Sequence, residues 1–214
     1  MRLKDFSRAQ LLDYLVAQLG HFFPDGLAVR QDLDRHLDQA LSRLRRLVNA
    51  VRMWPQEQFD YLHSTQYAIF LYFLANTIWR EERTAGICTK LFCLNKALNG
   101  IDCFYEIELP EIFFIGHTVG IVLAKASYGN YLVLYQNSTV GKNHGVAPVI
   151  EDRVVLYPNT SVIGRCLVRS ASIISQGTSV INRDTPGNCL VFGGTEGRLS
   201  FKPAARNIPA DFFR

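Results

Sequence analysis

A six-residue repeat in the second half of the chain limits most strongly what this sequence can fold into. Six positions, each six residues after the last, carry a large aliphatic residue: Ile150, Leu156, Val162, Val168, Ile174 and Val180. The residues four places after the first five are mostly small: Val154, Thr160, Cys166, Ser172 and Thr178. A period of six is neither that of an ordinary strand nor that of an α-helix, and it is typical of a parallel β-helix. The repeat therefore predicts three-sided coils of about 18 residues, with the aliphatic residues inside.

The repeat is interrupted once, and the interruption predicts a loop. The phase continues upstream through Val122, Tyr128, Leu134 and Val140, but ten residues separate Val140 from Ile150. Four extra residues should therefore protrude between Gly141 and Val149, outside the coil. Because the coil itself needs only packing, such an insertion is expected to carry binding or catalysis.

The first hundred residues have the periodicity of helices. Ser7 with Gln10 is a capping-box pattern, and Asn99-Gly100 is a C-terminal stop signal. The expected helices cover about residues 7–20, 29–53, 55–83 and 84–99. The fold class is therefore α+β: a helical N-terminal domain (1–100), a β-helix domain (101–194) and a C-terminal tail (195–214).

Composition excludes several classes of protein. Hydrophobic residues make up 48% of the 214, and 23 Lys and Arg against 19 Asp and Glu leave a formal net charge of +4, so disorder is not expected. The chain has no block of Lys and Arg that would indicate nucleic acid as a partner. Its five cysteines lack the spacing of a disulfide framework or a zinc site. The longest nearly apolar run, residues 67–79, is too short to span a bilayer, and the start is polar, so we expect a cytoplasmic protein.

Helices followed by hexapeptide repeats resemble the serine acetyltransferase branch of the hexapeptide acyltransferases, over about residues 67–194. The family's Val-Asp-Ile-His-Pro segment is similar to residues 100–104, Gly-Ile-Asp-Cys-Phe. Its Asp-His-Ala-Thr-Gly segment is similar to residues 116–120, Gly-His-Thr-Val-Gly, and His117 follows Asp102 by the family's spacing of fifteen residues. Ser138-Thr139-Val140-Gly141 looks like the family's Val-Thr-Leu-Gly-Gly. The resemblance implies a left-handed β-helix that forms a homotrimer or a dimer of trimers.

The resemblance also implies a mechanism. His117 would be the general base that takes the proton of an acceptor hydroxyl, and Asp102 would fix its tautomer and stabilise the imidazolium. The backbone N–H of Gly141 would hold the thioester oxyanion. Acetyl-CoA is the implied co-substrate, and no metal is required, since this half has only His117 and His144 where gamma-type carbonic anhydrases need three histidines.

Cofactor-binding positions follow from the same resemblance. The family's Ile-Gly-Ala-Gly-Ala and Ile-Gly-Ala-Gly-Ser segments fall on residues 156–160 and 174–178. The positions that would line the acetyl-CoA groove beside Gly141 are Tyr157, Pro158, Asn159, Ser175, Gln176 and Gly177. Lys202, in the tail, would lie near the nucleotide phosphates.

The sequence departs from the family where the amino acid substrate would bind. Gly116 replaces the family's Asp, and Val146-Ala147-Pro148 replaces an Arg-His-Pro segment in a shorter loop. Without these partners the charged ends of serine would be buried unpaired, which is costly. A saccharide hydroxyl fits better as acceptor, in a pocket that includes Gly116; His144 either contributes to this pocket or lies exposed on the loop.

Three functions stay open from the sequence. The first is an acetyl-CoA-dependent O-acetyltransferase in polysaccharide modification. The second is serine acetylation with a remodelled pocket, as in cysteine biosynthesis. The third is a catalytically silent scaffold, which the loss of polar pocket residues favours and the presence of Asp102 and His117 opposes.

Overall fold

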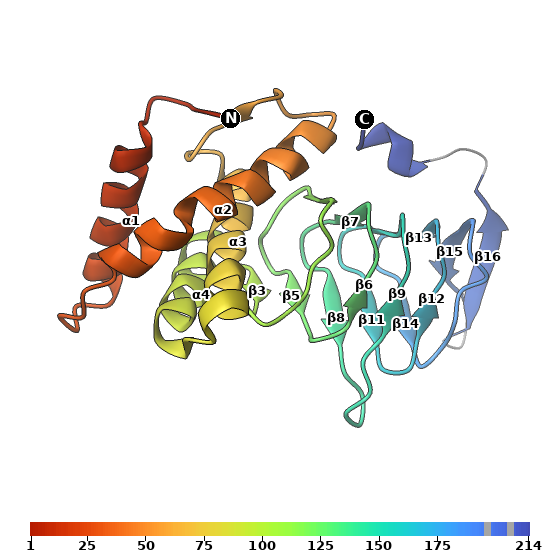
Figure 1. Ribbon diagram of the computed structural model, residues 1–214. Helices are drawn as coiled ribbons and strands as arrows, with labels where there is room; N and C mark the ends of the chain where they lie inside the picture. Colours follow the sequence, from red (N-terminus) through yellow and green to blue (C-terminus); the bar gives the residue numbers. More distant parts are fainter. Residues whose placement is uncertain (195–197, 205–207) are drawn as a thin grey trace.

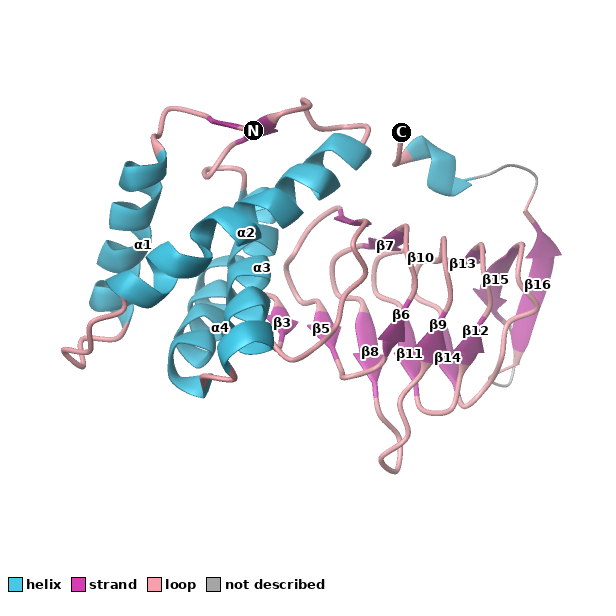
Figure 2. Ribbon diagram, viewed as in Figure 1, coloured by secondary structure: helices cyan, strands magenta, loops and turns pink. Residues whose placement is uncertain are grey.

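A computed structural model describes residues 1–194, 198–204 and 208–214. In this part of the chain, α-helices gather at one end and parallel strands form a solenoid at the other (Figures 1 and 2). The helices are α1 (Arg8–Phe22), α2 (Arg30–Ala50), α3 (Ser64–Glu82) and α4 (Ala85–Asn99). This confirms the predicted order of a helical half followed by a β-helix.

The solenoid contains most of the strands. They are β3 (Asp102–Cys103), β4 (Phe113–Ile115), β5 (Val122–Leu123), β6 (Ser127–Tyr128), β7 (Leu132–Leu134), β8 (Thr139–Gly141), β9 (Val149–Ile150), β10 (Val155–Leu156), β11 (Ser161–Ile163), β12 (Leu167–Val168), β13 (Ser172–Ile174), β14 (Ser179–Ile181), β15 (Cys189–Gly193) and β16 (Leu199–Pro203). They form three sheets: sheet one is β16-β15-β13-β10-β7-β4, sheet two β14-β11-β8-β5-β3 and sheet three β12-β9-β6. Apart from β16, which is antiparallel to β15, neighbouring strands are parallel.

Burial confirms the six-residue repeat. All six aliphatic residues from Ile150 to Val180 are at most 2% exposed. The four small residues that follow the repeat (Thr160, Cys166, Ser172 and Thr178) are buried too. Removing such side chains from water is the main favourable term in folding, so each coil is stabilised by the row it adds to the core.

The six-residue repeat that was predicted upstream of Ile150 is wrong at one position, Val122. Val122 is 43% exposed, whereas Leu123 is buried and pairs with the inward Val140. The step from Leu123 to Tyr128 is therefore five residues, because the first coil has one short side. Leu134 and Val140 are inside, as the repeat predicts.

The helix ends show where local signals were sufficient. The Ser7 hydroxyl accepts a hydrogen bond from the Gln10 N–H at 3.2 Å, and the Gln10 side chain accepts one from the Ser7 N–H at 2.8 Å. This confirms the capping box. The end predicted at Gly20 is wrong, since α1 continues to Phe22 and stops only before Pro24. Proline disfavours helical backbone in the residue before it, and Phe23 is accordingly non-helical.

The third helix begins later than predicted. Residues 55–63 hold β2 (Gln58–Phe59), which pairs in parallel with β1 (Arg2–Leu3) and buries Phe59. The helix starts at Ser64, where the His63 ring nitrogen accepts from the Gln66 N–H. Every residue from Thr65 to Ile78 is buried, as its apolar sequence predicts. None of the described helices is long and apolar enough to cross a membrane.

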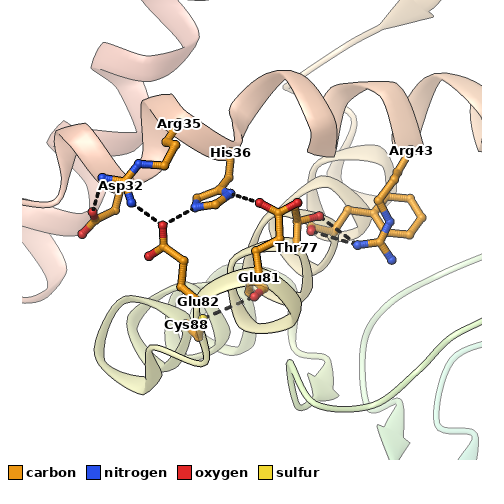
Figure 3. Close-up of polar contacts among 10 residues, drawn as sticks. Asp32, Arg35, His36, Arg43, Thr77, Glu81, Glu82 and Cys88 are labelled. Atoms are coloured by element: carbon orange, nitrogen blue, oxygen red, sulfur yellow. Dashed lines mark hydrogen bonds and ion pairs between the residues drawn. The ribbon is translucent and has the colours of Figure 1, made fainter.

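A buried histidine joins α2 to α3 (Figure 3). His36 is 2% exposed, and its ring nitrogens lie 3.0 Å from the Glu81 carboxylate and 2.8 Å from the Glu82 carboxylate. Arg35 also pairs with Glu82. Hydrogen bonds from His36 and Arg35 hold the pKa of Glu82 below its usual value.

The lowered pKa of Glu82 predicts acid sensitivity of the helical half. A carboxyl group whose pKa is lower in the folded state stabilises it above the unfolded pKa, and this stability is lost as the pH falls through the folded pKa. We expect Glu82→Gln to lower the urea midpoint at pH 7, and the difference from wild type to shrink as the pH falls from about 5 towards 3. A constant difference across this range would contradict the role of the charge.

Candidate active site

His117 lies in an insertion within the first corner, which we define as the turns that lead from sheet one into sheet two. This corner contains six residues in the first coil (116–121) but only four in the next (135–138), since Ile115 pairs with Leu134 and Val122 with Thr139. His117 is exposed. Its imidazole has no hydrogen bond or ion pair with any described residue, so it is accessible to a substrate.

Asp102 lies beside this insertion on β3. The Asp102 N–H donates to the Ile121 carbonyl at 2.8 Å, and the Gly120 N–H donates to the Gly100 carbonyl at 2.9 Å. The backbone thus joins the Asp102 strand to the segment that follows His117. Within the described part of the chain, however, no hydrogen bond joins the Asp102 carboxylate to the His117 ring.

Lys96 holds the carboxylate of Asp102 instead. The Lys96 ammonium, from the last turn of α4, lies 2.6 Å from Asp102 Oδ2, and this bond raises the pKa of Lys96. Gly100 ends α4 with a positive φ of 64°, which directs the chain back so that the two residues meet. Sequence reasoning missed Lys96, although its position four residues before that stop signal placed it near Asp102.

Tyr135 occupies the space beside Gly116. A Cβ atom on Gly116 would lie 2.6 Å from Cε1 of Tyr135, so a larger residue does not fit unless the ring moves. The ring is stacked on Tyr157, with centroids 5.6 Å apart, and meets Phe212 edge-on at 6.2 Å. Burial raises the pKa of Tyr135. The residue before His117 is therefore covered by an aromatic ring, a contact that no local pattern in the sequence predicts.

The structure brings most of the predicted cofactor-binding residues together on the first corner. Residues 157–159 and 175–177 are equivalent turns of successive coils, and the Gly177 N–H donates to the Pro158 carbonyl at 3.0 Å. Asn159 and Gly177 both have a positive φ. The two turns continue the row of corners that begins at His117.

Gly141 and His144 belong to the second corner, between sheets two and three. Gly141 pairs with Ile163 and Val149 with Leu167, so the connection is four residues longer here than in the next coil, as predicted. Asn143 and Val146 exchange both backbone hydrogen bonds, at 2.9 and 3.0 Å. His144 and Gly145 form the tip with positive φ values of 48° and 80°, typical of a tight hairpin, and His144 is exposed.

Lys202 lies at the far end of the solenoid. It is opposite Leu190 on β16, the outermost strand of sheet one, whereas His117 follows β4 at the other edge. Its ammonium lies 5.4 Å from the centre of the Phe192 ring. Neither Lys202 nor His144 is brought to the corner that holds His117 within one copy of the chain.

Comparisons with known proteins identify the fold. No protein-family model matches the sequence, and no curated protein is significantly similar to it. Among solved structures, serine acetyltransferase from Brucella abortus strain S19 matches with a TM-score of 0.71 and 19% identity, over 94% of this chain and 85% of that one. The chain has the serine acetyltransferase fold.

Other structures with this fold carry ligands. Neisseria gonorrhoeae serine acetyltransferase in complex with serine matches with a TM-score of 0.69 and 19% identity, over 91% of this chain and 83% of that one. A serine acetyltransferase in complex with CoA matches with a TM-score of 0.70 and 17% identity, over 91% and 85%. The resemblance drawn from the sequence is thus confirmed at the level of the fold.

The contact between Gly116 and Tyr135 predicts a coupled pair of substitutions. Gly116→Ala should cost about 2 kcal/mol of unfolding free energy, because Tyr135 is held by Tyr157 and Phe212 and cannot easily move away. In a Tyr135→Ala background the same change should cost almost nothing. Urea unfolding of the four proteins measures the coupling.

Gly193→Ala is the matched control, since an added Cβ atom there meets nothing within 4 Å. An equal cost of Gly116→Ala in both backgrounds would show that Tyr135 is not the obstacle.

Proposed function

We propose that this protein is an acetyl-CoA-dependent O-acetyltransferase that acetylates a hydroxyl of a saccharide. The observation that carries the proposal is the exposed His117 on a corner insertion, next to the strand of Asp102. The fold supports it, because structures with this fold are serine acetyltransferases, and one of those named above is a complex with CoA.

His117 is the general base of the proposed reaction. Its neutral ring nitrogen takes the proton of the acceptor hydroxyl while the oxygen attacks the thioester carbonyl. The C–S bond then breaks, and the imidazolium returns the proton to the departing CoA sulfur. No covalent enzyme intermediate is needed, because the thioester is already activated.

Asp102 acts through His117. A carboxylate that accepts from the second ring nitrogen fixes the tautomer and stabilises the imidazolium. Because Lys96 binds Oδ2, the other oxygen of Asp102 is available to His117. Lys96 is thus a positioning residue for Asp102.

Gly141 supplies the oxyanion donor from another copy of the chain. It lies on the second corner, across sheet two from His117, so one copy does not bring the two residues together. In the proposed homotrimer, the second corner of one copy would face the first corner of the next, with acetyl-CoA between them. The complete site is therefore shared between copies.

The aromatic rings of Tyr135, Tyr157 and Phe212 favour a saccharide as acceptor. Gly116 carries no carboxylate, and Tyr135 fills the space that one would need. The shorter loop presents Val146, 45% exposed, in place of charged partners. Such surroundings suit an uncharged, hydroxyl-rich ring, since an aromatic face packs against the C–H groups of a sugar. Serine is the second candidate acceptor, favoured by the serine complex with the same fold.

Replacement of His117 tests the reaction. Free-CoA release from acetyl-CoA, followed with a thiol reagent, should depend on a saccharide and fall about 10²- to 10⁴-fold in His117→Ala. His21→Ala, at an exposed position in the last turn of α1, should be unchanged. Release that depends on L-serine would establish the second candidate. No release with any acceptor, together with no binding of acetyl-CoA in a titration, would favour the scaffold.

Replacement of Asp102 tests its role as orienter. Asp102→Asn should lower kcat by about 10²-fold and leave KM for acetyl-CoA unchanged, because the amide cannot stabilise the imidazolium. Asp13→Asn removes an exposed carboxylate that pairs with Arg30 and serves as the control. A wild-type kcat in Asp102→Asn would mean that this carboxylate only anchors Lys96.

A further inference from the structure

A groove lies at the second corner, across sheet two from His117 within one copy of the chain. The groove has a volume of about 1030 Å³ and none of the predicted catalytic or cofactor-binding residues line it. One wall is the loop between Gly141 and Val149, the insertion for which the sequence predicted a function. The opposite wall is formed by residues 198–201 of the tail, and the floor by the turns after β11 and β14.

The groove is rich in arginine. Arg165, Arg183 and Arg198 line it, and Asp184 is its one acidic residue among those described. Asp184 is already engaged, since its Oδ1 accepts from the Leu167 N–H at 2.9 Å. The side chains of Arg165 and Arg183 have no hydrogen bond or ion pair with any described residue, and both residues are exposed.

This arrangement differs from that of several arginines in the helical half. There Arg8 pairs with Asp34 at 2.6 Å and Arg30 with Asp13 at 2.7 Å. Arg45 pairs with Glu57 at 2.9 Å. Guanidinium groups bind planar oxyanions through two parallel N–H donors, so two of them without such a partner in one groove favour an anionic ligand.

Apolar side chains line the same groove. Val146 and Val149 on the loop are 45% and 43% exposed, and Phe201 opposite them is 42% exposed. A small inorganic anion would leave this surface uncovered. A ligand with an oxyanion on a larger, uncharged body would cover it and engage the arginines.

We propose that this groove binds a carboxylate or phosphate group of an extended ligand, with Arg165 and Arg183 as the direct donors. Two sources share this chemistry: an acidic saccharide, which would be the acceptor, and the phosphates of acetyl-CoA. The choice between them rests on the proposed function, but the anion site itself does not.

Binding to the full-length chain tests the site without requiring turnover. Calorimetric titration at about 0.1 M salt would use a panel of sialic and uronic acid oligosaccharides beside their methyl esters, and CoA beside pantetheine. We expect Arg165→Gln/Arg183→Gln to weaken binding of the acidic member of one pair by about 30-fold or more, and to leave its uncharged partner unchanged. The Lys/Lys variant should retain part of the affinity, because the charge remains while the paired donors are lost.

A second double variant with the same change in net charge tests whether Arg165 and Arg183 act by direct contact or through the overall electrostatic field of the protein. Arg30→Gln/Arg153→Gln removes the same two charges outside the groove and should change each dissociation constant less than about 3-fold. Loss confined to the oligosaccharides identifies the acceptor as the source, and loss confined to CoA identifies its phosphates. Equal affinities in wild type and Arg165→Gln/Arg183→Gln, or no binding of any acidic probe to wild type, would overturn the proposal. Binding that is lost as expected, in a protein that transfers no acetyl group, would contradict the proposed function and leave the anion site standing.

Discussion

Burial of one large apolar side chain on nearly every side of the coils is the constraint on which the rest of the structure depends. A solenoid has no central core that distant parts share, so each coil is stabilised by the row that it stacks on its neighbours. A polar residue at Leu156 or Val162 would interrupt that row. The corners are less constrained, because the buried residues there, such as Thr160 and Cys166, are small and most other corner positions are at least partly exposed. This is why the first and second corners can carry the candidate sites without loss of the fold.

The two corner insertions differ in how they change the surface. At the second corner four residues form a separate hairpin, and the coil beneath it continues undisturbed. At the first corner the two extra residues lie within the turn itself, and the following side is one residue short, so Leu123 rather than Val122 faces inward. The coil that holds His117 is therefore irregular, and the α4–β3 connection that covers it brings Lys96 and Asp102 to the same edge.

The sequence was sufficient to predict the rows of buried side chains in the coils, but not the contacts between segments that are distant along the chain. The buried positions from Ile150 to Val180 repeat at a fixed interval, so periodicity alone predicted them. The capping box at Ser7 is local and was predicted as well. The predicted start of α3 was wrong, because residues before the helix form β2, which pairs with β1 over fifty residues away. The ring of Tyr135 over Gly116 also depends on stacking between coils, which no local pattern records. The roles of His117 and Asp102 remain predictions from the resemblance.

Residues 213 and 214 lie against the C-terminal end of α2 and the turn that follows it. Phe213 bridges to Val51, and the Arg214 guanidinium donates to the carbonyls of Asn49, Val51, Arg52 and Trp54. Stacked repeats ordinarily fray from whichever terminus is weaker, since each unit touches only its neighbours. Here the last residues are fastened to the opposite end of the stack. While this contact with the end of α2 holds, an unfolded final coil is tethered at both ends, so it gains less conformational entropy than a free terminus would.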